Sequence, residues 1–225
     1  MGPLPCVPVR PQLRFALPAI SAALAILLVL VIVLAGGTKG SSSRSDTQAG
    51  GFDGAVFPPG VRAADFTLEN QRGWRVSLST LRGQVVVLVF VSTHCRACML
   101  AAQQVRGALD ELTDAPTYGR GTSMPPTQVL FVSTDPPADA PARVQRFLVD
   151  SSLTTRAEYL SGTLAQLRPV WRAYRVPARS AERTASETAT TVLLIDRAGA
   201  ERVGFGLEQL TPESLAHDIR LLQAH

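Results

Sequence analysis

The longest apolar stretch of the chain lies near its N-terminus, where residues 15–37 contain no charged side chain. A helix needs about 20 apolar residues to cross a bilayer core, and this stretch meets that length. The apolar core of a cleavable signal peptide is shorter, about 7–15 residues. The pattern therefore favours an uncleaved transmembrane anchor held in the lipid bilayer, with a cleaved signal as the alternative.

The simplest topology places residues 1–14 in the cytoplasm as a short tail and everything after the span on the other side of the cell membrane. Residues 38–60 are rich in Gly, Ser and Pro. Such a composition does not bury a core and predicts a flexible linker. A folded, extracytoplasmic domain is then expected over residues 61–225.

Within that domain, several short segments carry the patterns of β-strands. Residues 64–78 alternate apolar and polar positions around a turn, which predicts two short strands. Residues 85–91 and 129–134 are continuous apolar runs rich in β-branched side chains, as in central strands covered on both faces. A further strand is predicted over 191–199, with 201–206 as its hairpin partner.

Helical patterns alternate with these strands. Apolar residues recur at spacings of three and four after residue 95, with polar residues between them. Helices are also predicted over 141–150, over 162–174 with a break or shift near Pro169, and over the C-terminal segment, where Thr211 can cap the first turn. Trp74 and Trp171 are interpreted as packing residues. This order predicts an α/β fold in which helices flank a central mixed sheet.

The three cysteines indicate redox or metal chemistry and not a disulfide scaffold, because only Cys95 and Cys98 are clustered. Cys95 lies between a buried strand and a helix, and unsatisfied N–H groups at a helix N-terminus stabilise a thiolate. The two-residue spacing brings both sulfurs onto one turn, so that Cys95 can attack a disulfide and Cys98 can resolve the product. A CxxC pair at such a junction indicates a thioredoxin-like fold. Cys6 is expected to have no redox partner, since the membrane separates it from the pair.

The neighbours of the pair leave several interpretations open. Arg96 either adds positive charge beside the thiolate or is a solvated surface residue. His94 tunes the thiol, ligates a metal or simply occupies an exposed turn. A structural zinc site needs a second cysteine pair or two suitably spaced histidines, whereas the chain offers only His94, His217 and His225.

Charge changes this picture little. The chain has a net charge of +4, which comes almost entirely from arginine. The basic residues are scattered and no nucleic-acid motif accompanies them, so no nucleic-acid partner is expected.

Several blocks of the domain resemble the Sco/SenC family of the thioredoxin superfamily, in the order in which the family has them. The blocks are ADFTLENQRGWRVSLSTLRGQVVVLVFVSTHC, VLFVSTDP, PARVQRFL, YLSGTLAQLRPVWRAY and TVLLIDRAG, within residues 61–223. Members of the family are membrane-anchored extracytoplasmic proteins that bind copper and help to deliver it to cytochrome c oxidase, and some are thiol-disulfide reductases. The resemblance implies Cys95 and Cys98 as copper ligands, and extracytoplasmic protein thiols or an oxidase subunit as partners.

Two departures from the family pattern bear on function. The family usually has three residues between its cysteines, where this chain has two, and the position of its later histidine ligand falls at or near Thr188. The two-residue spacing matches thioredoxin-type reductases and the TlpA/ResA-like group, although residues 188–191 lack that group's proline. We therefore expect a membrane-anchored thiol-disulfide oxidoreductase of Sco-like type that acts on protein cysteines or in respiratory oxidase copper-site assembly. Thiol exchange requires no cofactor. The alternatives are a Cu(I) metallochaperone that uses Cys95 and Cys98, and a non-catalytic interaction module with a structural disulfide.

Overall fold

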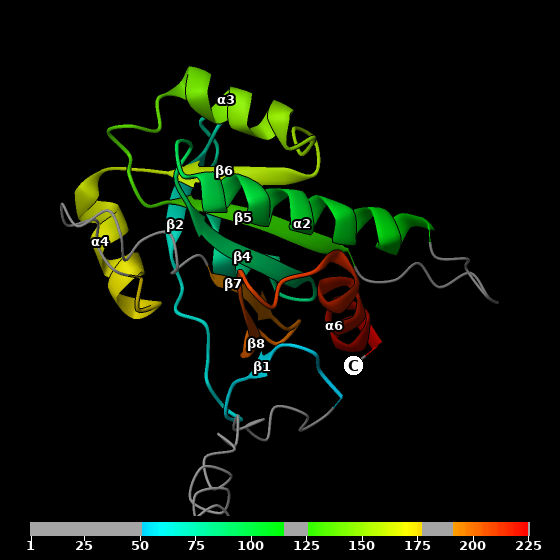
Figure 1. Cartoon of the computed structure of the whole chain (residues 1–225). Coiled ribbons are helices and arrows are strands. Elements are labelled where there is room, and N and C mark those ends of the chain that lie inside the picture. Colours follow the sequence, from blue (N-terminus) through cyan, green and yellow to red (C-terminus); the bar gives the residue numbers. More distant parts are fainter. Residues whose placement is uncertain (1–50, 115–125, 177–190, 225) are drawn as a thin grey trace, which may run out of the picture. The chain divides into compact units, whose positions relative to one another are not determined.

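The computed structural model describes residues 51–114, 126–176 and 191–224 (Figure 1). In these residues the strands form one eight-stranded mixed sheet with the order β1-β8-β7-β4-β5-β6-β2-β3. The predicted anchor over 15–37 lies outside this part of the chain. Among the helices that the structure describes, none is long and apolar enough to cross a membrane.

The centre of the sheet consists of three parallel strands, β4 (Val85–Val91), β5 (Thr127–Ser133) and β6 (Ala157–Ser161). On its other side β4 pairs antiparallel with β7 (Thr191–Ile195). All seven residues of β4 are buried, which confirms that the apolar run is a strand covered on both faces. Because β4, β5 and β6 are parallel, their carboxyl ends lie at one edge of the sheet.

Antiparallel strands complete the two sides of the sheet. The predicted hairpin partner of β7 is β8 (Glu201–Gly206), which pairs in turn with β1 (Ala55–Val56). On the opposite side, β6 pairs with β2 (Thr67–Asn70), and β2 pairs with β3 (Arg75–Ser77). The strand β6 was not predicted from the sequence; its five residues alternate imperfectly between buried and half-buried positions.

Residues 52–56 belong to the folded domain, so the predicted flexible linker over 38–60 is wrong for this segment. Phe52 is buried in the core, and β1 adds to the edge of β8. Gly54 permits this close approach, because a Cβ atom at this position would collide with Val203 and Phe205 on β8. Gly54, which the composition assigned to a linker, is therefore needed for the packing of this segment against β8.

Helices cover the two faces of the sheet with separate cores. The helices α2 (Arg96–Asp114), α3 (Pro141–Asp150) and α6 (Pro212–Ala224) pack on the face that contains Val85, Val87, Val89 and Val91. The other face is covered by α4 (Leu164–Ala173) and the short 3-10 helix η2 (Leu78–Leu81). In Figure 1, α2 and α6 lie side by side, and α4 stands apart from them.

The predicted break near Pro169 is also wrong, because α4 continues through this residue. Thr163 and Gln166 form a capping box at its N-terminus, in which the Thr163 hydroxyl accepts the Gln166 N–H at 3.3 Å. Val170 and Trp171 are buried immediately after the proline. The cap and the buried face compensate for the hydrogen bond that Pro169 does not donate.

Candidate thiol redox site

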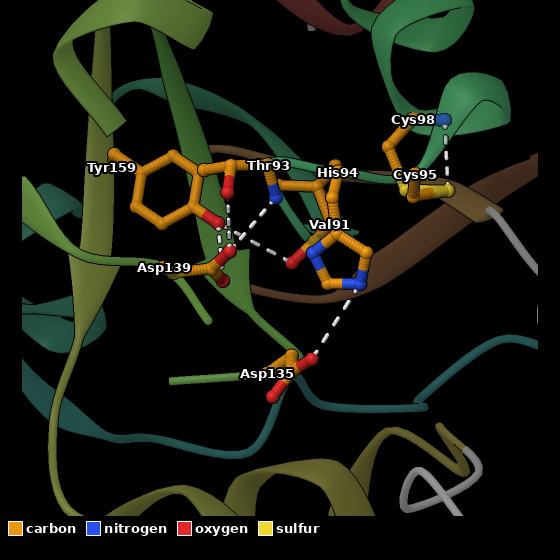
Figure 2. Close-up of a disulfide and its surroundings, with 8 residues drawn as sticks. All are labelled: Val91, Thr93, His94, Cys95, Cys98, Asp135, Asp139 and Tyr159. Atoms are coloured by element: carbon orange, nitrogen blue, oxygen red, sulfur yellow. Dashed lines mark hydrogen bonds and ion pairs between the residues drawn. A yellow bond between two sulfur atoms is a disulfide. The ribbon is translucent and has the colours of Figure 1, made fainter. Parts of the chain in front are cut away.

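The cysteine pair lies where β4 passes into α2. Cys95 directly precedes α2, and its backbone N–H donates to the Ser92 carbonyl at 3.2 Å. A disulfide joins Cys95 to Cys98, with 5.2 Å between their Cα atoms. The backbone N–H of Cys98 donates to Cys95 Sγ at 3.1 Å (Figure 2). Cys95 thus occupies the N-cap position of α2, and its sulfur accepts the bond that a capping oxygen would accept.

The two sulfurs differ in exposure. Cys95 is half-buried, whereas Cys98 is 4% exposed and packs in the core beneath α2. In the reduced form, the Cys98 N–H and the positive end of α2 favour a thiolate on Cys95. Cys95 is therefore the sulfur that a partner protein can reach, and Cys98 is buried in the core next to it.

His94 turns toward the end of β5. Its Nε2 atom lies 3.6 Å from Asp135 Oδ2, and Figure 2 shows the imidazole directed at this carboxylate. The side chain of His94 is 36% exposed and that of Asp135 is 16% exposed. His94 therefore has a described partner and is more than a polar residue in an exposed turn. Arg96, the first residue of α2, is exposed.

A second carboxylate, that of Asp139, is buried next to the cysteine loop. Its Oδ1 accepts the backbone N–H and the hydroxyl of Thr93, both at 2.8 Å. Its Oδ2 accepts the hydroxyl of Ser133 at 2.6 Å and the hydroxyl of Tyr159 at 2.7 Å. The carboxylate of Asp139 thus joins Ser133 and Tyr159 to Thr93, which stands two positions before Cys95. Figure 2 shows Thr93 and Tyr159 directed at this carboxylate.

Tyr159 is held in its neutral form at this position. Burial is the main reason that the pKa of Tyr159 is raised well above its ordinary value, and the charge of Asp139 raises it further. The phenol is therefore a hydrogen-bond donor to Asp139 over the whole physiological range.

Asp135, Asp139 and Tyr159 were not predicted as site residues. One signal was available, because the carboxyl ends of parallel strands meet at one sheet edge. Residues that follow β5 should therefore lie near Cys95, which follows β4. Tyr159 gave no such signal, since its strand was not predicted.

The remaining predicted residues do not join this site. Cys6 and Thr188 lie outside the described residues. His217 is on α6, where its Nε2 atom lies 3.0 Å from the Gly51 carbonyl. Trp171 is buried, as predicted, and its Nε1–H donates to the Ser133 carbonyl at 2.9 Å. Trp74 is 64% exposed, so the prediction of a packing role is wrong for this residue.

Comparison with known proteins identifies relatives of the chain. The family model described as SCO1/SenC matches residues 59–223. The mitochondrial SCO2 homolog of Bos taurus is 32% identical over 123 residues, which are 54% of this chain and 43% of the bovine protein. The chain thus spans less than half the length of this curated relative.

Solved structures show the same fold. Arabidopsis thaliana ScoI with copper bound is 20% identical with a TM-score of 0.59, over 73% of this chain and 100% of that one. Bradyrhizobium japonicum ScoI with copper bound is 25% identical with a TM-score of 0.50, over 72% and 99% of the two chains. BsSco, in which a disulfide switch was identified, is 17% identical with a TM-score of 0.59, over 74% and 95%.

Proposed function

The chain belongs to the SCO1/SenC family, and from that premise we propose that it is a membrane-anchored extracytoplasmic thiol-disulfide oxidoreductase. It acts on protein cysteines, including those of a copper site during assembly of a respiratory oxidase. The observation that supports this best is the unequal pair at the start of α2. Cys95 is half-exposed and accepts the Cys98 N–H, while Cys98 is 4% exposed.

The reaction follows from this asymmetry. The Cys95 thiolate attacks one sulfur of a partner disulfide, so a mixed disulfide forms and one partner thiolate leaves. Cys98 then loses its proton and attacks Cys95 Sγ, which forms the Cys95–Cys98 disulfide and releases the second partner thiolate. The partner gains two electrons and the pair loses two. The reverse sequence oxidises a partner dithiol.

The environment of the reaction is the second part of the proposal. The apolar segment 15–37 anchors the chain in the cell membrane by a single span, with the described domain outside the cytoplasm. Disulfides persist in that compartment, and oxidase cysteines or other extracytoplasmic protein thiols are exposed there. The family supports this placement.

A redox titration of the full chain tests the proposal. We would purify the chain in detergent as Cys6→Ser, so that the pair supplies the only thiols, equilibrate it in glutathione buffers and count alkylated cysteines by mass spectrometry. One two-electron transition is expected, and Cys95→Ser should abolish it. Its absence in the Cys6→Ser chain would overturn the proposal.

A trapping experiment separates the two cysteines. With Cys98→Ser, a mixed disulfide between Cys95 and a model peptide disulfide should accumulate, because no second thiol resolves it. With Cys95→Ser, the buried Cys98 should form little adduct. Equal adduct formation by the two variants would contradict the assigned order of attack. A pair that never exchanges with the peptide would instead support the structural disulfide of an interaction module.

A Cu(I) metallochaperone is the second candidate function. Two ScoI relatives have been solved with copper bound, and a reduced pair of soft thiolates suits Cu(I). His94 lies next to Cys95 and is oriented by Asp135, so an imidazole is available to complete a ligand set. Titration of the reduced Cys6→Ser chain with Cu(I) and a competing chelator tests this. Replacing both cysteines should abolish binding, and an unchanged affinity would exclude the pair as the copper site.

A further inference from the structure

The loop before Cys95 is fastened to the rest of the domain through Thr93. Both hydrogen-bonding groups that Thr93 offers as donors, its backbone N–H and its hydroxyl, meet the same oxygen of Asp139 at 2.8 Å. One residue earlier, Ser92 is 4% exposed and accepts the N–H of Cys95 through its carbonyl. The position of Cys95 is thus defined by a chain of contacts that ends on Asp139.

Asp139 is itself rigidly held. It is 5% exposed, and its second oxygen accepts hydroxyls from Ser133 at the end of β5 and Tyr159 on β6. Both donors come from central strands, and both are less than 2% exposed. Four donors therefore converge on two oxygens, which suits an acceptor-only carboxylate and leaves no room for a donor.

We propose that Asp139 is a positioning residue for the thiol pair. Its carboxylate ties Thr93 to Ser133 at the end of β5 and to Tyr159 on β6, and this contact holds Cys95 Sγ within reach of the Cys98 N–H at the start of α2. The inference rests on the proposed thiol-exchange function. It assigns a role in that function to a buried carboxylate whose described hydrogen bonds come from Thr93, Ser133 and Tyr159.

The physical reason lies in what reduction does to the pair. When the Cys95–Cys98 bond accepts two electrons and two protons, the covalent link between the cysteines is lost. The loop 92–95 then depends on its hydrogen bonds to keep Cys95 at the helix N-terminus. Asp139 makes two of these bonds, so weakening it should destabilise the reactive arrangement of the reduced form more than the disulfide form.

The test compares variants of the full chain that all carry Cys6→Ser. Thr93→Val removes the hydroxyl that donates to Asp139 and keeps the shape, while Thr93→Ser retains the hydroxyl. Asp139→Asn replaces one acceptor with a donor. Ser151→Ala is the matched control, because it deletes a different buried hydroxyl, which donates to the Phe147 carbonyl at 2.7 Å at the end of α3.

Two measurements are made on each variant, the reduction potential of the pair and the rate at which the reduced chain attacks 5,5′-dithiobis(2-nitrobenzoic acid). Thr93→Val and Asp139→Asn should lower the attack rate about tenfold through misplacement of Cys95. A tenfold change in the exchange equilibrium corresponds to about 30 mV for a two-electron couple, and the potential should shift by that order. Thr93→Ser and Ser151→Ala should match the Cys6→Ser chain in both.

The inference is overturned if Thr93→Val and Asp139→Asn keep the parent potential and rate. It is equally overturned if Ser151→Ala changes the potential and the rate as much as Thr93→Val does, since a general loss of stability would then explain both changes. If Asp139→Asn does not fold, Thr93→Val against Thr93→Ser decides alone. Failure of the Cys6→Ser parent to show a two-electron transition removes the proposed function and the inference together, and so differs from a normal parent with unresponsive variants.

Discussion

Asp139 and Asp218 are both buried carboxylates in the described domain, and each fastens a segment that looks loose in the sequence. Asp139 holds the loop before Cys95. Asp218, on α6, accepts the backbone N–H groups of Asp53 at 2.8 Å and Gly54 at 3.0 Å, and so holds the segment that leads into β1. A buried aspartate thus holds the loop beside the thiol pair in one case and the segment that leads into an edge strand in the other.

The difference between them lies in the donors. Asp139 meets four donors, three of them hydroxyls, whereas the described donors to Asp218 are two backbone groups. Burial is the main cause that raises the pKa of Asp218. The charge of Asp53 adds to this, and the two backbone hydrogen bonds and His217 oppose it. The described residues therefore give Asp139 at the thiol site more hydrogen-bond donors than they give Asp218 near the start of the sheet.

Asp53, His217 and Asp218 bring their ligand-type atoms within 4.8 Å of one another. Their described hydrogen bonds account for this proximity. Asp218 binds the backbone of 53–54, and His217 Nε2 meets the Gly51 carbonyl. The cluster thus docks the N-terminal segment of the domain onto α6.

The largest expected effect is the loss of stability when either aspartate is replaced by alanine, and it should be larger for Asp139 than for Asp218. Asp139→Ala leaves the four donors of Thr93, Ser133 and Tyr159 without their acceptor and should lower the free energy of unfolding by about 4 kcal/mol. Asp218→Ala leaves two and should lower it by about 2 kcal/mol. Urea unfolding of the full chain in detergent measures both, with the fluorescence of buried Trp171 as the probe. Equal losses would show that the number of donors does not matter.

Much of the architecture was predictable because it depends on local patterns. The apolar run of β4, the 3.6-residue periodicity of α2 and the β7–β8 hairpin are encoded in adjacent residues. The placement of Cys95 before a helix follows from the same patterns. Local patterns failed where tertiary packing decides the structure. One case is β1, which follows a glycine-rich segment and pairs with β8; the other is Pro169, which packing and a capping box keep within α4.

The Asp139 network was predictable only in part, because it depends on the order and direction of the strands in the sheet. Thr93, Ser133, Asp139 and Tyr159 come from separate parts of the chain, and no spacing rule connects them. Only the topology, with β4, β5 and β6 parallel, brings them to one edge. The sequence therefore predicts the reactive pair and not the residues that hold it.

A smaller effect is expected in the pH dependence of stability. Because the pKa of Asp218 is raised above its ordinary value of 3.8, the folded state binds this proton more tightly than the unfolded chain does. The free energy of unfolding should then fall as the pH rises from 3.8 through the higher pKa of the folded state, and level off above it. Asp218→Asn should remove this slope. The effect should be smaller than the loss in Asp218→Ala, because ionisation leaves both backbone bonds in place.

The slope is measured as the difference between the parent chain and Asp218→Asn in urea unfolding at a series of pH values. Taking the difference cancels the other titrating groups, among them Asp65, whose pKa is lowered because hydrogen bonds from Ser79, Phe66 and Ser77 outweigh its burial. If the difference between the two chains is independent of pH, Asp218 does not titrate differently on folding.

The smallest effect on stability is expected at Asp110, whose carboxylate is exposed, in contrast to the buried carboxylates of Asp139 and Asp218. Asp110 on α2 accepts Arg106 Nη1 at 2.7 Å and also Arg156 Nη1. The hydrogen bond from Arg156 is the main cause that lowers the pKa of Asp110. The stabilisation should therefore be present above the ordinary pKa of an aspartate and be lost as the pH falls through the lowered pKa of the folded state.

Asp110 is 38% exposed, so water and salt screen its charge. Asp110→Asn should lower the free energy of unfolding by only about 0.5 kcal/mol, and the loss should shrink in 1 M salt. A loss as large as that of Asp218→Ala would mean that paired charge, and not burial with complete hydrogen bonding, makes a carboxylate matter in this domain.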